Sequence, residues 1–342
     1  MTTEEHVEAT IENLLREERE FPPPAAFIGN ALLSDPHVYD HASTEEGFRA
    51  FWTQEGNRLE WMEPWTELYT WDVPYTKWFI GGKLNVSVNC LDRHVRAGLG
   101  DRIAYHWEGE PGDTRTITYQ QLLDDVCRFT NALRGLGVKK GDRVAIYMPM
   151  IPELPVAMLA CTRIGAPHSV VFGGFSADAL ADRIEDASCS VVITADGGFR
   201  KGAEVPLKNA ADEAIGRTSS VQHCVVVKRT GDDVAWTDGR DHWYHELIDG
   251  QATTADPEPM DSEDLLYLLY TSGTTAKPKG IMHSTGGYLA GVAATHRSIF
   301  DIHASGLIGS PTVPSRRRDD RSFDAGSSGP HFMNVRMAVG AV

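Results

Sequence analysis

The sequence has few cysteines, and they are arranged in a way that excludes two classes of protein. Five cysteines occur among 342 residues, widely spaced and without a CxxC pair: Cys90, Cys127, Cys161, Cys189 and Cys224. This spacing is typical neither of a zinc site nor of a disulfide framework. We therefore expect no metal site, and we interpret the cysteines as small buried side chains in a reducing compartment.

The sequence also lacks a long hydrophobic run. Its most apolar window, residues 144–160, is interrupted by Pro149, Pro152, Glu153 and Pro155, which excludes a membrane-spanning helix there. The first residues are acidic and show neither the basic nor the apolar region of an export signal. We expect a cytoplasmic protein with no membrane partner.

Positive charge is scarce. Lysine and arginine number 32 against 48 acidic residues, for a net charge of −16. Such an excess disfavours nonspecific binding to nucleic acid, so we expect no nucleic-acid partner, and a phosphate-bearing ligand must meet a local positive patch. The hydrophobic content of 42% is sufficient for a large core in one or two domains. The oligomeric state stays open.

The middle of the chain alternates between strand and helix patterns. Thr118 and Gln121 form a capping box ahead of helically spaced apolar residues, and Ser176 is a further N-cap. The patterns predict strands at 144–147, 168–172, 191–194 and 221–227, and helices at 154–164 and 207–215. This order is typical of an α/β fold, layered, with a largely parallel sheet and flanking helices.

Residues on either side of this region follow different patterns. Residues 1–95 are irregular and contain five tryptophans that we expect to pack as a wrap around the main domain: Trp52, Trp61, Trp65, Trp71 and Trp78. Basic residues are not interleaved with them, which disfavours a platform for stacking bases. Residues 303–342 show neither periodicity and contain arginines but no lysine. We expect this tail to be disordered.

A polar loop follows the predicted buried strand 265–269. Residues 270–280 combine hydroxyl side chains, a glycine and two lysines, which can aim donors at one polyphosphate. The candidate ATP phosphate ligands are Thr271, Ser272, Gly273, Thr274, Thr275 and Lys277. Pro278 follows Lys277 and removes a backbone donor where the helix of a Walker A loop would begin. The alternative is a solvated surface turn.

The loop resembles the phosphate-binding signature of the adenylate-forming superfamily. Four further strings, at 78–94, 141–153, 168–176 and 283–288, resemble acetyl-CoA synthetases and their short-chain relatives, and the resemblance runs from about residue 47 to 302. It implies the incomplete N-terminal domain of an adenylate-forming enzyme. The implied organisation is an acetyl-CoA-synthetase-type N-terminal wrap at 1–95, a partial AMP-binding domain at 96–302 and an unrelated tail at 303–342.

The resemblance also implies an activity and its ligands. Members of the family convert ATP, acetate and CoA to acetyl-CoA, AMP and pyrophosphate through acetyl-adenylate, with Mg²⁺ accompanying the ATP. Arg200, with Lys201 beside it, matches a segment that contacts CoA, whereas Ala203 replaces a common arginine. Ala276 replaces the usual glycine of the phosphate loop, which costs about 1–2 kcal/mol if that position requires a positive φ.

Several alternatives remain open. No catalytic residue is assigned, because the family's C-terminal catalytic lysine has no match, and we expect this chain not to complete the reaction. In that case the chain is a noncatalytic remnant that binds ATP or CoA. Our hypothesis is that a change of reading frame near residue 302 explains where the resemblance ends. A propionate or other short-chain acyl-CoA synthetase is a further alternative, as is a small regulator that uses Arg316, Arg317 and Arg318. We interpret His94, His168 and His283 as structural.

Overall fold

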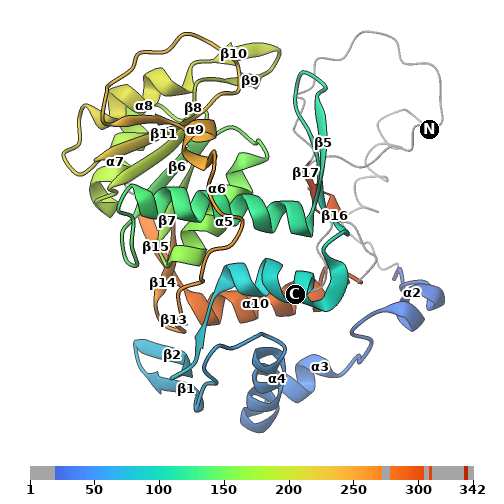
Figure 1. The fold of residues 1–342 in the computed structure, drawn as a ribbon. Coiled ribbons are helices and arrows are strands. Elements are labelled where there is room, and N and C mark those ends of the chain that lie inside the picture. The colour runs from blue at the N-terminus through green and yellow to red at the C-terminus, as the bar shows by residue number, and fades with distance from the viewer. Residues whose placement is uncertain (1–19, 272–277, 304–307, 310–334, 338–342) are drawn as a thin grey trace, which may run out of the picture.

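A seven-stranded sheet forms the centre of the molecule (Figure 1). The computed structural model describes residues 20–271, 278–303, 308–309 and 335–337. The strand order is β12-β11-β8-β6-β7-β14-β15. The strands are β6 (Val144–Met148), β7 (His168–Phe172), β8 (Val191–Ala195), β11 (His223–Val227), β12 (Asp241–Trp243), β14 (Leu265–Thr271) and β15 (Lys279–Ser284). All neighbours are parallel except β14 and β15, which confirms the predicted largely parallel sheet.

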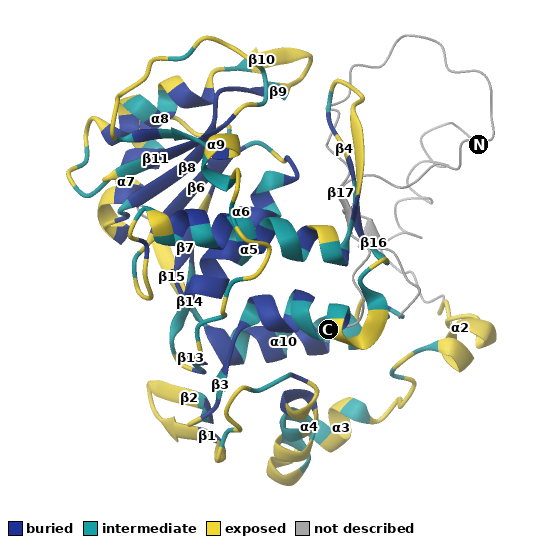
Figure 2. Ribbon diagram, in the orientation of Figure 1, coloured by how far each residue is buried: buried dark blue, intermediate teal, exposed yellow. Residues whose placement is uncertain are grey.

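Helices cover the central strands. Helices α5 (Tyr119–Gly135), α6 (Glu153–Ile164) and α9 (Tyr244–Ile248) form one packed group, and α7 (Ala177–Ala187) and α8 (Leu207–Ile215) form another. Every residue of β6 and β8 is buried (Figure 2). The capping box is confirmed, since the Gln121 amide donates to Thr118 Oγ1 at 3.2 Å and the Thr118 amide donates to Gln121 Oε1 at 3.0 Å. Ser176 caps α7, also as predicted.

The N-terminal region is more regular than the sequence indicated. It contains α2 (Ala25–Asn30), α3 (Val38–Ala42), α4 (Glu45–Asn57) and a hairpin of β1 (Glu67–Asp72) and β2 (Tyr75–Ile80). Four tryptophans pack in its apolar cluster, as predicted: Trp52, Trp61, Trp65 and Trp78. Trp71 is the exception, with 70% of its surface exposed. Helix α10 (Thr285–Ser298) completes the cluster through Leu289.

Short strands and hairpins lie around these layers. β3 (Lys83–Leu84) pairs with β13 (Met260–Asp261). β4 (Ile103–Glu108) pairs with β5 (Thr114–Thr118), and β9 (Gly198–Arg200) with β10 (Ala203–Val205). Residues 88–92 and 95–99 are π-helical turns. Among the described residues, no helix is long and apolar enough to cross a membrane.

Two short strands fall within the expected tail. β17 (Val335–Met337) pairs antiparallel with β4, and β16 (Ile308–Gly309) pairs with β17. The rest of the tail beyond residue 303 lies outside the described residues. The interpretation of 303–342 as an unrelated segment therefore stays a prediction.

One side of the central sheet leaves apolar side chains exposed. Val170 and Phe172 of β7 are 36% and 52% exposed, and Leu269 of β14 and Ile281 of β15 are each 45% exposed. Leu269 and Ile281 are register partners, so their side chains share a face. Their neighbour Leu268 points to the other face and is buried. Burial in this sheet thus falls from β6 toward β15.

Candidate functional site

Two described segments of the candidate site, the end of β14 at Thr271 and the β9–β10 hairpin with Arg200, lie at the carboxyl edge of the parallel strands. β6 connects to β7 on one side, and the chain then crosses back over β6 to continue with β8 and β11 on the other. In such sheets the outgoing connections diverge and leave a crevice at the carboxyl ends. Gly173 and Gly174 follow β7, Asp196 follows β8 and Thr271 ends β14. This topology brings the segments predicted from sequence to one edge.

The phosphate loop is described only at its two ends. Thr271 is the exposed last residue of β14 and is paired in register with Lys279, the first residue of β15. A strand therefore follows the loop where a Walker A loop would have a helix. The predicted ligands Ser272, Gly273, Thr274, Thr275 and Lys277, together with Ala276, lie outside the described residues.

Contacts with helix α7 hold the base of this loop. The Tyr270 hydroxyl donates to Asp186 Oδ2 at 2.6 Å, and burial, together with this bond, raises the pKa of Tyr270. The guanidinium of Arg183 lies over the rings of Phe175 and Tyr270, at 4.9 and 5.4 Å from their centroids. Burial lowers the pKa of Arg183. These contacts tie β14 to α7 immediately before Thr271.

Arg200 reaches the same edge from hairpin β9–β10. Its guanidinium lies 4.9 Å from the centroid of the Phe172 ring, at the end of β7. Gly174 permits this approach, because a Cβ there would lie 2.1 Å from an Arg200 guanidinium nitrogen. Lys201 follows in the turn, exposed, with a positive φ of 54°. Arg200, one of the two predicted CoA ligands, thus contacts β7. This strand lies between β6 and β14 in the sheet.

The sequence analysis missed Asp196, which organises this edge. Its carboxylate accepts hydrogen bonds from the backbone N–H groups of Gly197 at 2.7 Å, Arg229 at 2.6 Å, Thr230 at 3.0 Å and Gly231 at 2.8 Å. Only 1% of Asp196 is exposed. A buried carboxylate is stable when several amides hydrogen-bond to it. Its sequence signal is an acid directly after a strand that is apolar except for Thr194, and before two glycines.

The described residues contain no group of three or more histidine, cysteine or acidic side chains placed to hold a metal ion. His94 and His168 are buried, and burial lowers the pKa of each to about 4. The Tyr267 ring lies between the rings of His168 and His283, at 6.0 and 4.3 Å between centroids. His94 and His168 are thus part of the buried interior, whereas His283 is half-buried on β15. Cys127, Cys161, Cys189 and Cys224 are also buried, and Cys90 is half-buried.

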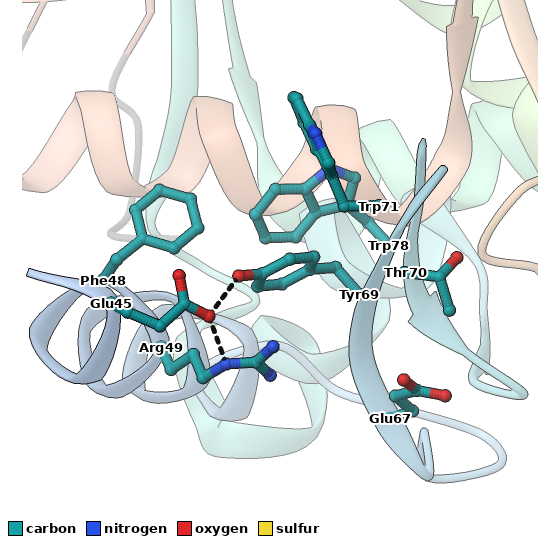
Figure 3. A pocket seen from close by; sticks show the side chains of 8 residues that line it. All are labelled: Glu45, Phe48, Arg49, Glu67, Tyr69, Thr70, Trp71 and Trp78. Atoms are coloured by element: carbon teal, nitrogen blue, oxygen red, sulfur yellow. Dashed lines mark hydrogen bonds and ion pairs between the residues drawn. The ribbon is translucent and has the colours of Figure 1, made fainter. Parts of the chain in front are cut away.

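A hollow lies between α4 and the β1–β2 hairpin (Figure 3). Glu45 accepts hydrogen bonds from the Tyr69 hydroxyl and from Arg49 Nε, both at 2.7 Å, and the Arg49 guanidinium lies 4.5 Å above the Tyr69 ring. Trp71 and Trp78 stand beside this group. Glu45 and Arg49 are engaged with each other, and the hollow lies on different elements from the carboxyl edge. We do not include it in the candidate site.

Comparisons with known proteins show the family of the chain. Residues 39–90 match the family model described as acetyl-coenzyme A synthetase N-terminus, and residues 91–310 match the one described as AMP-binding enzyme. The chain is 56% identical over 294 residues to an acetyl-coenzyme A synthetase of Streptomyces coelicolor, which covers 86% of this chain and 45% of the relative.

Two other relatives give the same result. An acetyl-coenzyme A synthetase of Mycobacterium tuberculosis is 55% identical over 286 residues, covering 82% of this chain and 44% of the relative. One of Gemmatimonas aurantiaca is 50% identical over 298 residues, covering 85% and 45%. The chain spans about half the length of these curated relatives. The AMP-binding match covers more than half of the chain, which therefore belongs to the family of AMP-binding enzymes and carries the N-terminal region typical of acetyl-coenzyme A synthetases.

Proposed function

We propose that this chain is the nucleotide-binding part of an AMP-forming acetate–CoA ligase. The complete reaction joins acetate to CoA at the expense of ATP, through acetyl-adenylate, and releases AMP and pyrophosphate. The observation that carries the proposal is the position of the Thr271 loop and the Arg200 hairpin on one sheet edge, with Phe172 in contact with Arg200. The relatives named acetyl-coenzyme A synthetase support the substrate assignment. A cytoplasmic location belongs to the same proposal.

Charge dictates the role of each group. Acetate must approach a polyanion, so donors that neutralise the ATP phosphates favour the first half-reaction. We assign this role to Thr271, Ser272, Gly273, Thr274, Thr275 and Lys277, with Mg²⁺ arriving bound to ATP. Arg200 and Lys201, exposed at the β9–β10 turn, are assigned to the phosphate groups of CoA. Each charge-assisted contact contributes roughly 1.5–3 kcal/mol.

We propose that these 342 residues bind nucleotide. We propose the complete ligase reaction only for a protein as long as the relatives. Titration calorimetry with Mg²⁺–ATP tests the first statement, and pyrophosphate release from ATP and acetate tests whether the chain also adenylates. We expect ATP binding without pyrophosphate release. Absence of ATP binding would contradict the proposal, whereas release of pyrophosphate with propionate in preference to acetate would change the substrate.

The Ala276→Gly variant sharpens the assignment of the loop. If the backbone at this position needs a positive φ, glycine relieves a cost of about 1–2 kcal/mol. We then expect ATP to bind roughly tenfold more tightly in the same calorimetric titration. Unchanged or weaker binding would show that the backbone there is ordinary.

A further inference from the structure

Hairpin β9–β10, which carries Arg200 and Lys201, is too small to fix its own orientation. Its two strands have three residues each and pair only with one another. Isolated two-stranded hairpins are marginally stable at best in water. The direction in which the two cationic side chains point must therefore depend on contacts with the rest of the molecule.

Arg229 supplies the main contact. Its guanidinium donates to both carboxylate oxygens of Asp113, at 2.7 and 3.0 Å. The same group lies 5.0 Å from the ring centroid of Phe199 in β9 and 5.2 Å from that of Trp107 in β4. The hydrogen bonds from Arg229 lower the pKa of Asp113. One side chain thereby joins the hairpin of Arg200 to hairpin β4–β5.

Both ends of Arg229 are held. Its backbone N–H donates to the buried Asp196 carboxylate at 2.6 Å, and its side chain is only 18% exposed. Gly109 packs closely against the Arg229–Asp113 pair. A Cβ at this position would lie 2.8 Å from the Arg229 guanidinium and 2.3 Å from Asp113 Oδ1, so a larger residue would displace the pair. Planar, two-bond arginine–carboxylate pairs are among the most directional contacts in proteins.

A second contact holds the tip of the hairpin. The Gly202 N–H donates to Glu110 Oε1 at 2.5 Å, again from hairpin β4–β5. Lys201, between Arg200 and Gly202, has a positive φ of 54°, a conformation that side-chain-bearing residues adopt only when their surroundings impose it. The tip and the base of hairpin β9–β10 are therefore both fastened to β4–β5.

We propose that Arg229 is a positioning residue that orients hairpin β9–β10, and with it Arg200, for the phosphate groups of CoA. The inference rests on the proposed function. When the hairpin is already ordered, CoA binding does not include the free-energy cost of ordering it. Loss of the Arg229 contacts therefore weakens CoA binding even though no residue that contacts CoA is removed. Arg229 itself need not touch CoA.

The experiment combines hydrogen exchange with calorimetry on the whole chain. Exchange is followed at the amides of residues 198–205, and CoA and Mg²⁺–ATP are titrated separately. The variants are Arg229→Ala, the conservative Arg229→Lys, and Asp113→Asn. The control is Arg217→Ala, because Arg217 is an exposed arginine that also forms ion pairs, with Glu213 at 2.5 Å and with Asp178.

We expect Arg229→Ala to accelerate exchange in the hairpin and to weaken CoA binding about tenfold, with ATP affinity unchanged. Arg229→Lys keeps a charge for Asp113 but loses the planar two-bond pair, so it should restore part of the affinity. Arg217→Ala should behave as wild type. Selective loss of CoA affinity separates positioning from general destabilisation, which would weaken both ligands.

Unchanged exchange at 198–205 in both Arg229→Ala and Asp113→Asn would overturn the inference, as would wild-type CoA affinity in Arg229→Ala. If Arg229→Ala does not fold, Arg229→Lys and Asp113→Asn decide the same question. A wild-type chain that binds ATP but no CoA contradicts the CoA assignment and the affinity part of the inference together. The exchange data then still decide whether Arg229 orders the hairpin.

Discussion

The two halves of the central sheet are stabilised in different ways. On the β8–β11 side, charged groups are buried inside completed networks, such as Asp196 with its four amide donors. On the β7–β14–β15 side, Phe172, Leu269 and Ile281 expose apolar surface on one face. The first half therefore fixes its part of the candidate site by contacts within the described chain. The second half carries the base of the candidate phosphate loop, on strands whose side chains are more exposed than those of β6 and β8.

Lys208 tests the first half and has the largest expected effect. It is fully buried and donates to Asp212 at 2.7 and 2.8 Å, to Asp241 at 2.9 Å and to the Ala235 carbonyl at 2.9 Å. Lys208→Met leaves the carboxylates short of a counter-charge, so we expect the free energy of unfolding to fall by about 3–5 kcal/mol in urea titrations.

Exposed Lys201 provides the matched control, since Lys201→Met should change the free energy of unfolding by no more than about 0.5 kcal/mol. Equal effects of the Lys208 and Lys201 variants would contradict a completed charge network on this side of the sheet.

Two neighbouring leucines of β14 compare the two faces of the second half. Leu268 is 8% exposed, whereas Leu269 is 45% exposed. Leu268→Ala should lower the free energy of unfolding by roughly 2–5 kcal/mol, because it empties a packed site. Leu269→Ala should change it by about 0.5 kcal/mol or less. Urea unfolding of the pair measures the contrast, and similar losses at both positions would show that the exposed face is covered.

Acid should destabilise the sheet through His168 on β7. Burial lowers its pKa to about 4 from 6.5, so the unfolded chain binds the proton more tightly. The stabilising contribution is therefore present above pH 6.5 and is lost as the pH falls toward 4. Between pH 7 and 4.5, protonation of His168 should lower the free energy of unfolding by about 2–3 kcal/mol.

The His168→Phe variant, which keeps a ring against Tyr267, should lose less stability than wild type over that pH range. Urea unfolding at the two pH values measures the difference between the two proteins. Parallel losses in wild type and variant would exclude His168 as the cause.

Local signals explain which parts of the fold could be predicted. β7 and α8 begin and end at the predicted residues, and β6, β8 and α6 differ by a single residue, because stretches rich in apolar residues mark them. The β1–β2 hairpin was missed, because its strands are largely exposed and show no clean alternation of burial.

The candidate site also contains residues that could be proposed from the sequence and contacts that could not. Its loop could be proposed from the sequence because its residues are contiguous, and Arg200 could be proposed by resemblance; both assignments stay predictions. The contacts that hold the hairpin could not be predicted, since Arg229 and Asp113 are 116 residues apart in sequence and meet only through the topology of the sheet. Asp196 was missed for a similar reason, because three of its donors come from the segment after β11.

The most direct test of the account is a calorimetric titration of CoA into the wild-type chain and its Arg200→Ala variant. Arg200 is exposed at the carboxyl edge, and loss of its charge-assisted contacts should cost roughly 1.5–3 kcal/mol. The account predicts that wild type binds CoA, that Arg200→Ala binds it about 10- to 100-fold more weakly, and that Mg²⁺–ATP affinity is unchanged. Equal CoA affinity in the two proteins would contradict the assignment of this edge to CoA.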